Sequence, residues 1–300
     1  MRVRTWLVLI ATLLLWSGNW IVARAVREEI SPGVATLGRL VVVLAILVPF
    51  AWRGIAAKLP ALSRREWLVI AGLGFTGGGP HLGLQWLGLH YTTAASGILY
   101  LSTTPIFILL LTTALGERIV ARRWGGVAIS FAGVFLIATQ GHPERLSFNR
   151  GDLMAIGSMM LWAGYTVLLR VRRDPLEVIE LLCMVCAFGV LFMTPWVVWE
   201  AASGARLALT QPGALAIIYS AIGSLLLAYA GWSYVVSRLG AARAGVTLHL
   251  MPAFGVLLST IFLGEYPHWF HFAGMALILA GVTLSSGIRS ARRARSYRRA

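Results

Sequence analysis

The 300-residue chain is 58% hydrophobic and only 12% charged, and its mean hydropathy is +0.77. A soluble domain typically carries about 25% charged residues, so this composition excludes a soluble globular protein. The formal net charge of +15 does not indicate a nucleic-acid partner, because the basic residues lie in short clusters between apolar runs and in the tail Arg289–Arg299. We therefore expect an integral membrane protein.

Ten apolar runs follow one another along the chain, each near the roughly 20 residues that a helix needs to cross a bilayer. The connections between them are short, so successive helices should pack as antiparallel neighbours. The predicted fold class is an all-α integral membrane protein with ten transmembrane helices, at residues 5–23, 34–52, 67–89, 92–115, 122–139, 150–169, 177–199, 213–235, 241–263 and 269–288.

The basic residues predict the orientation of these spans. With the N-terminus in the cytoplasm, most arginines and lysines fall in cytoplasmic segments, in agreement with the positive-inside rule. The opposite side holds only Arg24, Arg27, Arg145, Arg150 and Arg206. We therefore expect a multi-pass protein of the cell (inner) membrane with both termini in the cytoplasm.

The second half of the sequence repeats the first at an offset of 146 to 148 residues. The matches occur in chain order and include Trp16-Ser-Gly18 with Trp162-Ala-Gly164, Pro49 with Pro195, Trp86 with Trp232, and Pro105 with Pro252. Since each half has an odd number of spans, the two halves should enter the membrane from opposite sides. Such inverted repeats are typical of secondary transporters. The predicted units are residues 1–146, residues 147–289 and a basic cytoplasmic tail at 290–300.

Several of these motifs together resemble a known family. They are W-S-G-N-W at 16–20, the mid-helix prolines that precede each Leu-Gly-Glu (115–117 and 263–265), and Ala-Gly-Val at 132–134 and 280–282. The chain is similar over essentially its whole length to the EamA-type members of the drug/metabolite transporter superfamily. This resemblance implies export of small solutes, and YddG-type exporters of aromatic and other amino acids are the most similar group.

Polar and aromatic residues at mid-span are candidates for the binding site, because an unpaired polar group in hydrocarbon is costly. Many lie three or four positions apart and so share a helix face, and inward-facing aromatic rings suit flat or amphipathic ligands. The candidate substrate-binding residues are Trp16, Asn19, Trp20, His81, Gln85, Tyr100, Trp162, Tyr165, Tyr229, His249 and Arg39. For His81 and His249, hydrogen bonding to neighbouring helices is an equal alternative.

Arg39 is the sole basic residue well inside a span. Its side chain could extend outward to the membrane surface, or it could attract a substrate carboxylate. Pro105 and Pro252 each remove a backbone hydrogen bond, and their paired positions predict hinges.

Other functional classes find little support in the sequence. Gly72-Leu-Gly74-Phe-Thr-Gly77 matches a dinucleotide-binding pattern but lies within a span, and Cys183 and Cys186 lie in an apolar run, where cysteine is usually a small hydrophobe. We expect no catalytic residues, metal or cofactor, and hence no enzyme.

The expected partners are a small-molecule substrate, namely an amino acid or related metabolite, and the lipid bilayer; a monomer is compatible with the sequence. One alternative function is multidrug or toxic-solute export, although no acidic residue at mid-span would hold a drug cation. A second alternative, from another class, is a non-transporting membrane scaffold or enzyme.

Overall fold

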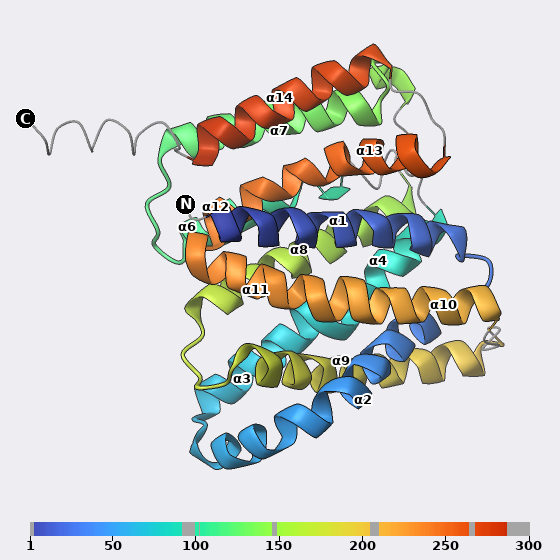
Figure 1. Cartoon of the computed structure of the whole chain (residues 1–300), viewed down its shortest axis with the longest axis vertical. Coiled ribbons are helices and arrows are strands. Elements are labelled where there is room, and N and C mark those ends of the chain that lie inside the picture. Colours follow the sequence, from blue (N-terminus) through green and yellow to red (C-terminus); the bar gives the residue numbers. More distant parts are fainter. Residues whose placement is uncertain are drawn as a thin grey trace, which may run out of the picture.

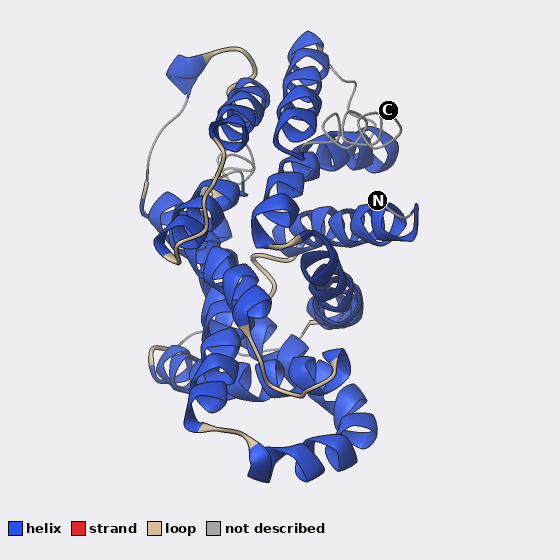
Figure 2. Ribbon diagram, turned by 90° about the vertical axis from the view of Figure 1, so that its left-hand side faces the viewer, coloured by secondary structure: helices blue, strands red, loops and turns tan. Residues whose placement is uncertain are grey.

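The computed structural model describes residues 3–91, 100–101, 103–145, 149–204, 210–263 and 268–286, and every regular element within these ranges is helical (Figures 1 and 2). The α-helices are α1 (Val3–Ala25), α2 (Pro32–Lys58), α3 (Arg64–Leu73), α4 (Gly79–Tyr91), α6 (Thr104–Ala114), α7 (Ala121–Ala138), α8 (Arg150–Val171), α9 (Val178–Ala202), α10 (Gln211–Tyr219), α11 (Ala228–Leu239), α12 (Ala241–Thr247), α13 (Met251–Leu263) and α14 (Trp269–Ser286).

Five helical stretches within the described ranges are long and apolar enough to cross a membrane: Val3–Ala23, Pro32–Ala61, Arg150–Val171, Val178–Ala202 and Gln211–Leu239. The prediction of an all-α protein with several membrane-crossing helices is therefore confirmed. The count of ten spans stays a prediction, and so does the division at residue 146. Part of the fourth predicted span and the whole tail 290–300 lie outside the described residues.

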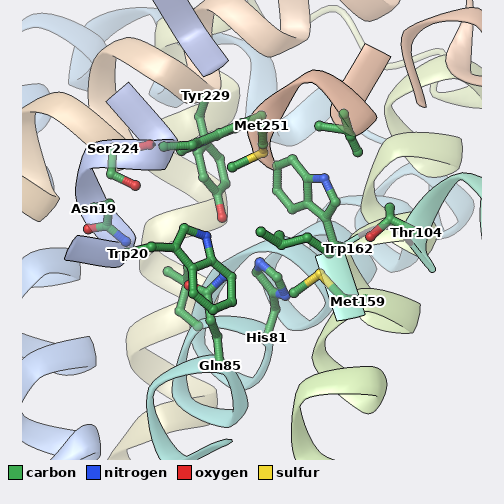
Figure 3. Close-up of a pocket in the computed structure, with 14 residues that line it drawn as sticks. Asn19, Trp20, His81, Gln85, Thr104, Met159, Trp162, Ser224, Tyr229 and Met251 are labelled. Atoms are coloured by element: carbon green, nitrogen blue, oxygen red, sulfur yellow. Dashed lines mark hydrogen bonds between the residues drawn. The ribbon is translucent and has the colours of Figure 1, made fainter. Parts of the chain in front are cut away.

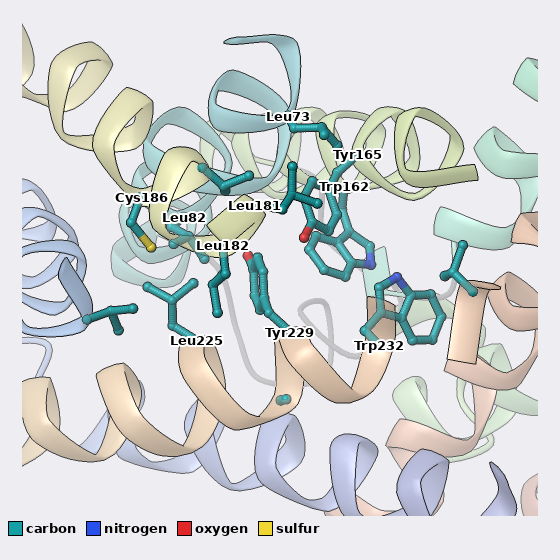
Figure 4. Close-up of a cluster of buried hydrophobic side chains, with 14 of the residues drawn as sticks. Leu73, Leu82, Trp162, Tyr165, Leu181, Leu182, Cys186, Leu225, Tyr229 and Trp232 are labelled. Atoms are coloured by element: carbon teal, nitrogen blue, oxygen red, sulfur yellow. The ribbon is translucent and has the colours of Figure 1, made fainter. Parts of the chain in front are cut away.

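The helices are arranged in a series along the longest axis of the molecule (Figure 1). The pair α7 and α14 lies at one end, the pair α2 and α9 lies toward the other, and α1, α4, α8 and α11 lie between them. The largest hydrophobic cluster occupies this central region, where Trp162, Tyr165, Tyr229 and Trp232 meet leucines of α4 and α9 (Figure 4). The arrangement places the aromatic residues of the predicted site inside the protein.

Two of the ten predicted spans, residues 67–89 and 213–235, contain a π-helical segment where the sequence pattern predicted continuous helix. Gly74–Gly78 joins α3 to α4, and Ser220–Leu227 joins α10 to α11. The two segments occupy equivalent places in the two halves, since Gly77 and Gly223 are 146 residues apart. A π-helical turn interrupts the regular i to i−4 hydrogen bonds and is frequently found at functional sites.

Helices α2 and α9 are joined at one end through the carboxylate of Glu200, which is 6% exposed. This carboxylate accepts hydrogen bonds from the Ser31 hydroxyl (2.8 Å), the Gly33 amide (3.1 and 3.2 Å) and the Trp196 indole (2.8 Å). Ser31 also caps the N-terminus of α2, where a negative charge is favourable because of the helix dipole. Glu200, on the neighbouring helix α9, therefore accepts hydrogen bonds from donors at the N-terminus of α2.

The opposite end of the same helix pair is held by an ion pair. Lys58 Nζ lies 2.9 and 2.7 Å from the two carboxylate oxygens of Glu180, at the first turn of α9. Gly54 allows this approach, because a Cβ at that position would overlap the Glu180 carboxylate. Contacts at both ends fix α2 against α9 over its full length.

Replacement of Glu200 by glutamine is expected to lower the free energy of unfolding by about 1–3 kcal/mol, because a buried charge-assisted hydrogen-bond acceptor is lost. The thermal unfolding midpoint of the purified protein in detergent measures this change. Glu28→Gln is the matched control, since the Glu28 side chain is 80% exposed. Equal midpoints for the two variants would show that the Glu200 contacts do not stabilise the protein.

Candidate functional site

A pocket lies where the central helices meet (Figure 3). The side chains that line it come from α1, α4, α6, α8, α11 and α13, together with residues of the irregular segments between helices. They are Trp16, Asn19, Trp20, His81, Leu82, Gln85, Leu101, Thr104, Met159, Trp162, Ser224, Tyr229, Leu248 and Met251. The lining is thus aromatic and aliphatic, with a few amide, hydroxyl and imidazole groups, which is the usual composition of a small-molecule site.

The two halves of the chain contribute equivalent positions to this pocket. Four pairs of lining residues are separated by 146 or 147 positions, the offset of the sequence repeat: Trp16 and Trp162, Leu82 and Tyr229, Leu101 and Leu248, and Thr104 and Met251. The pocket therefore lies between the halves and belongs to both.

Trp162 on α8 is the centre of an aromatic cluster in the pocket wall. Its ring stacks on His81 (centroids 5.2 Å apart) and on Tyr165 (4.9 Å), and it meets Trp16 edge to face (5.1 Å) and Tyr229 in a tilted edge contact (5.1 Å). These separations fall in the range of favourable aromatic pairs. The cluster presents a rigid wall against which a flat ligand could pack.

The π-helical segments anchor two of these rings. The Trp16 indole donates a hydrogen bond to the Ser224 carbonyl (3.0 Å), and the Tyr229 hydroxyl donates one to the Gly77 carbonyl (2.6 Å). Both carbonyls lie within π-helical segments. Each half therefore fixes an aromatic side chain of the pocket through its irregular segment.

His81 is positioned by reciprocal contacts with Ser158 on α8. Its Nδ1 lies 2.8 Å from the Ser158 carbonyl, and the Ser158 hydroxyl donates to the His81 carbonyl (2.9 Å). The Nδ1–H group thus has an acceptor, which in a neutral ring leaves Nε2 as an acceptor. His81 thus joins α4 to α8 and also lines the pocket, and its role in substrate binding stays a prediction.

Four uncharged polar side chains complete the lining, those of Asn19, Gln85, Thr104 and Ser224. Asn19 accepts a hydrogen bond from the Ser220 hydroxyl (2.6 Å), and Gln85 contributes a second amide from α4. The Thr104 hydroxyl is fully buried and has no hydrogen-bond partner within the described protein. A buried hydroxyl without a partner is costly, so Thr104 is suited to bind a polar group of a ligand.

Seven of the predicted site residues line this pocket: Trp16, Asn19, Trp20, His81, Gln85, Trp162 and Tyr229. Four do not. Tyr165 packs behind Trp162, Tyr100 is buried beside Met159, and His249 is buried in the 3-10 turn Leu248–Leu250. Arg39 is fully buried as well and does not extend to the surface; its guanidinium contacts the carbonyl of Leu82.

Sequence reasoning missed seven lining residues: Leu82, Leu101, Thr104, Met159, Ser224, Leu248 and Met251. The paired prolines could have identified four of these. Leu101 and Leu248 precede Pro105 and Pro252 by four positions, and Thr104 and Met251 precede them by one. Both prolines stand in the first turn of a helix, α6 or α13, where proline is tolerated. Their role as hinges stays a prediction.

Several membrane-crossing helices around a largely aromatic pocket are typical of polytopic membrane proteins that handle small solutes. Within this class the chain belongs to the EamA-like transporter family, whose sequence model matches residues 4–139 and again residues 149–287. The chain is thus a membrane transporter rather than an enzyme.

Individual proteins support this assignment. The chain is 28% identical over 290 residues to a protein of Archaeoglobus fulgidus described as an uncharacterized transporter, covering 95% of this chain and 98% of that protein. It is 26% identical to a protein of Streptantibioticus cattleyicolor described as a "Probable terminal-alkyne amino-acid exporter", covering 92% and 91% of the two chains. A solved crystal structure has the same fold, with a TM-score of 0.73, 21% identity and 98% coverage of this chain.

Proposed function

We propose that this transporter exports amino acids with aromatic or amphipathic side chains, and related small metabolites, through the central pocket. The observation that carries the proposal is the composition of that pocket: a wall of stacked rings around Trp162, with amide and hydroxyl groups of Asn19, Gln85 and Thr104 nearby. Rings suit the side chain of such a solute, and the polar groups suit its amino and carboxylate ends. The similarity to a protein described as an amino-acid exporter agrees with this substrate class.

Transport would proceed by alternating access, with ten helices in two inverted halves and both termini in the cytoplasm. Two halves of opposite orientation can exchange roles and open one shared site to either side of the membrane. The equivalent positions that the halves contribute to the pocket support this mechanism, because eight of the fourteen lining residues form four pairs related by the repeat.

The experiment is a flux assay with the purified protein in liposomes, using a panel of amino acids and drug cations. Saturable flux of tryptophan, phenylalanine or tyrosine is the expected result. Flux of drug cations alone would instead support multidrug export. If no solute showed saturable flux, both amino-acid export and multidrug export would be rejected. Among the described residues, none of those that line the pocket is acidic, so the amino-acid outcome is favoured over the cation outcome.

A further inference from the structure

The buried arginine behind the pocket carries a positive charge that no acidic group of the described protein neutralises. Arg39 lies in α2, is fully buried and takes part in none of the ion pairs formed within the described ranges. Burying an ion without a counter-charge is expensive, and such residues inside membrane segments usually serve function. The position of Arg39 therefore requires an explanation.

The hydrogen bonds of Arg39 are few and long for a group with five N–H donors. Its Nη2 reaches the Leu82 carbonyl at 3.3 Å and the Thr36 hydroxyl at 3.4 Å, while Nε has no acceptor. The guanidinium also lies over the Trp86 ring, 5.2 Å from its centroid, and the buried Trp86 indole N–H likewise lacks an acceptor. Two adjacent donors without acceptors indicate a local excess of positive potential.

This positive potential reaches the pocket. Leu82, whose carbonyl contacts Arg39, is itself a lining residue, and Gln85 on the same helix is another. The guanidinium thus contacts a residue of the lining directly, in a medium of low dielectric constant where charges act over longer distances than in water.

We infer that Arg39 makes the pocket selective for solutes that carry a carboxylate, by supplying the positive charge that such a group neutralises on binding. This inference rests on the proposed function and narrows its substrate class to amino acids and carboxylates, excluding amines without a carboxylate. Arg39 acts as a specificity-determining residue from behind the wall, while Thr104, Asn19 and Gln85 offer the direct hydrogen bonds.

The test compares three probes that share an indole ring: tryptophan, tryptamine, which lacks the carboxylate, and indole-3-propionate, which lacks the amine. Binding to the purified protein is measured by calorimetry, because tryptamine crosses bilayers unaided. The wild type should bind tryptophan and indole-3-propionate about tenfold more tightly than tryptamine, as expected for one uncompensated charge at this range. Preference for tryptamine would overturn the inference.

Variants of Arg39 identify the source of this preference. Arg39→Gln should weaken binding of tryptophan and indole-3-propionate about tenfold and leave tryptamine unchanged, whereas Arg39→Lys, which keeps the charge, should retain most of the preference. Arg53→Gln is the matched control, because Arg53 is exposed on the same helix. If Arg39→Gln changed the affinity for all three probes equally, the role of Arg39 would be structural only, and the inference would be overturned.

Two outcomes separate this inference from the proposed function. Saturable amino-acid flux without carboxylate preference would overturn the inference alone. Absence of both flux and binding for every indole probe and every amino acid would overturn the two together. If Arg39→Gln does not fold, a wild type without carboxylate preference still overturns the inference, and retention of the preference in Arg39→Lys supports it.

Discussion

Replacing Trp162 by alanine is expected to reduce transport to below about one tenth of the wild-type rate, since one lost stacking partner of about 1.4 kcal/mol corresponds to a tenfold change in binding. Trp162 contacts the rings of Trp16, His81, Tyr165 and Tyr229 at once, so its loss also opens a cavity in the pocket wall. The cavity should lower the free energy of unfolding by about 3–5 kcal/mol. Flux per reconstituted protein and the thermal unfolding midpoint measure the two effects.

Two further variants separate binding from general damage to the fold. Trp162→Phe keeps a ring in the wall and should retain most of the stability and a measurable part of the flux. Trp199→Ala, at a side chain that is 65% exposed, should leave both unchanged. If Trp162→Ala transported at the wild-type rate, the aromatic wall would have no part in substrate binding.

Much of the pocket could be predicted from sequence, because a polar side chain at mid-span is costly in hydrocarbon unless it faces the protein interior or a binding site. Trp16, Asn19 and Trp20 share one helix, and the structure places all three in the lining. The same reasoning pairs Trp16 with Trp162 through the repeat, and these two rings lie 5.1 Å apart. Residue type and spacing thus identified the lining residues of α1, whereas on α8 they also selected Tyr165, which packs behind Trp162.

The remaining lining residues depend on features that residue type does not reveal. The hydrophobic pattern of residues 67–89 and 213–235 fits continuous helix, and it gives no sign of the π-helical segments that expose the Gly77 and Ser224 carbonyls. In the sequence, apolar lining residues such as Leu82 and Met159 cannot be distinguished from lipid-facing or core residues by their type. Their place in the lining follows from tertiary packing, which the local pattern does not encode.

The partners of charged residues were equally hard to predict. Arg39 could be located within a span, but whether its side chain reached the surface or the interior depended on α4, whose Leu82 carbonyl it contacts. The same holds for Glu200, which lies near a predicted membrane boundary and instead binds the first turn of α2. Long-range pairs of this kind require the packing of helices that are far apart in sequence.

Replacing Gly126 by leucine is expected to separate α7 from α14 and to lower the free energy of unfolding by about 3 kcal/mol or more. A Cβ at this position would lie 2.6 Å from the Gly281 carbonyl oxygen and 2.8 Å from the Ser285 amide nitrogen. Both are backbone atoms of α14, so no side-chain rotation relieves the overlap. Small residues allow such close helix packing inside membranes, and the recovery of monodisperse protein and its unfolding midpoint measure the loss.

Gly125→Leu provides a control one residue away on the same helix. A Cβ at Gly125 has no heavy atom within 4 Å, so this variant changes helix propensity and hydrophobicity as Gly126→Leu does but adds no overlap. It should unfold at or slightly above the wild-type midpoint, because glycine is unfavourable within a helix by about 1 kcal/mol. Equal behaviour of the two variants would mean that α7 and α14 do not pack through this glycine. A selective loss in Gly126→Leu together with loss of flux would show that the pocket requires the α7–α14 pair, although neither helix contributes a lining residue.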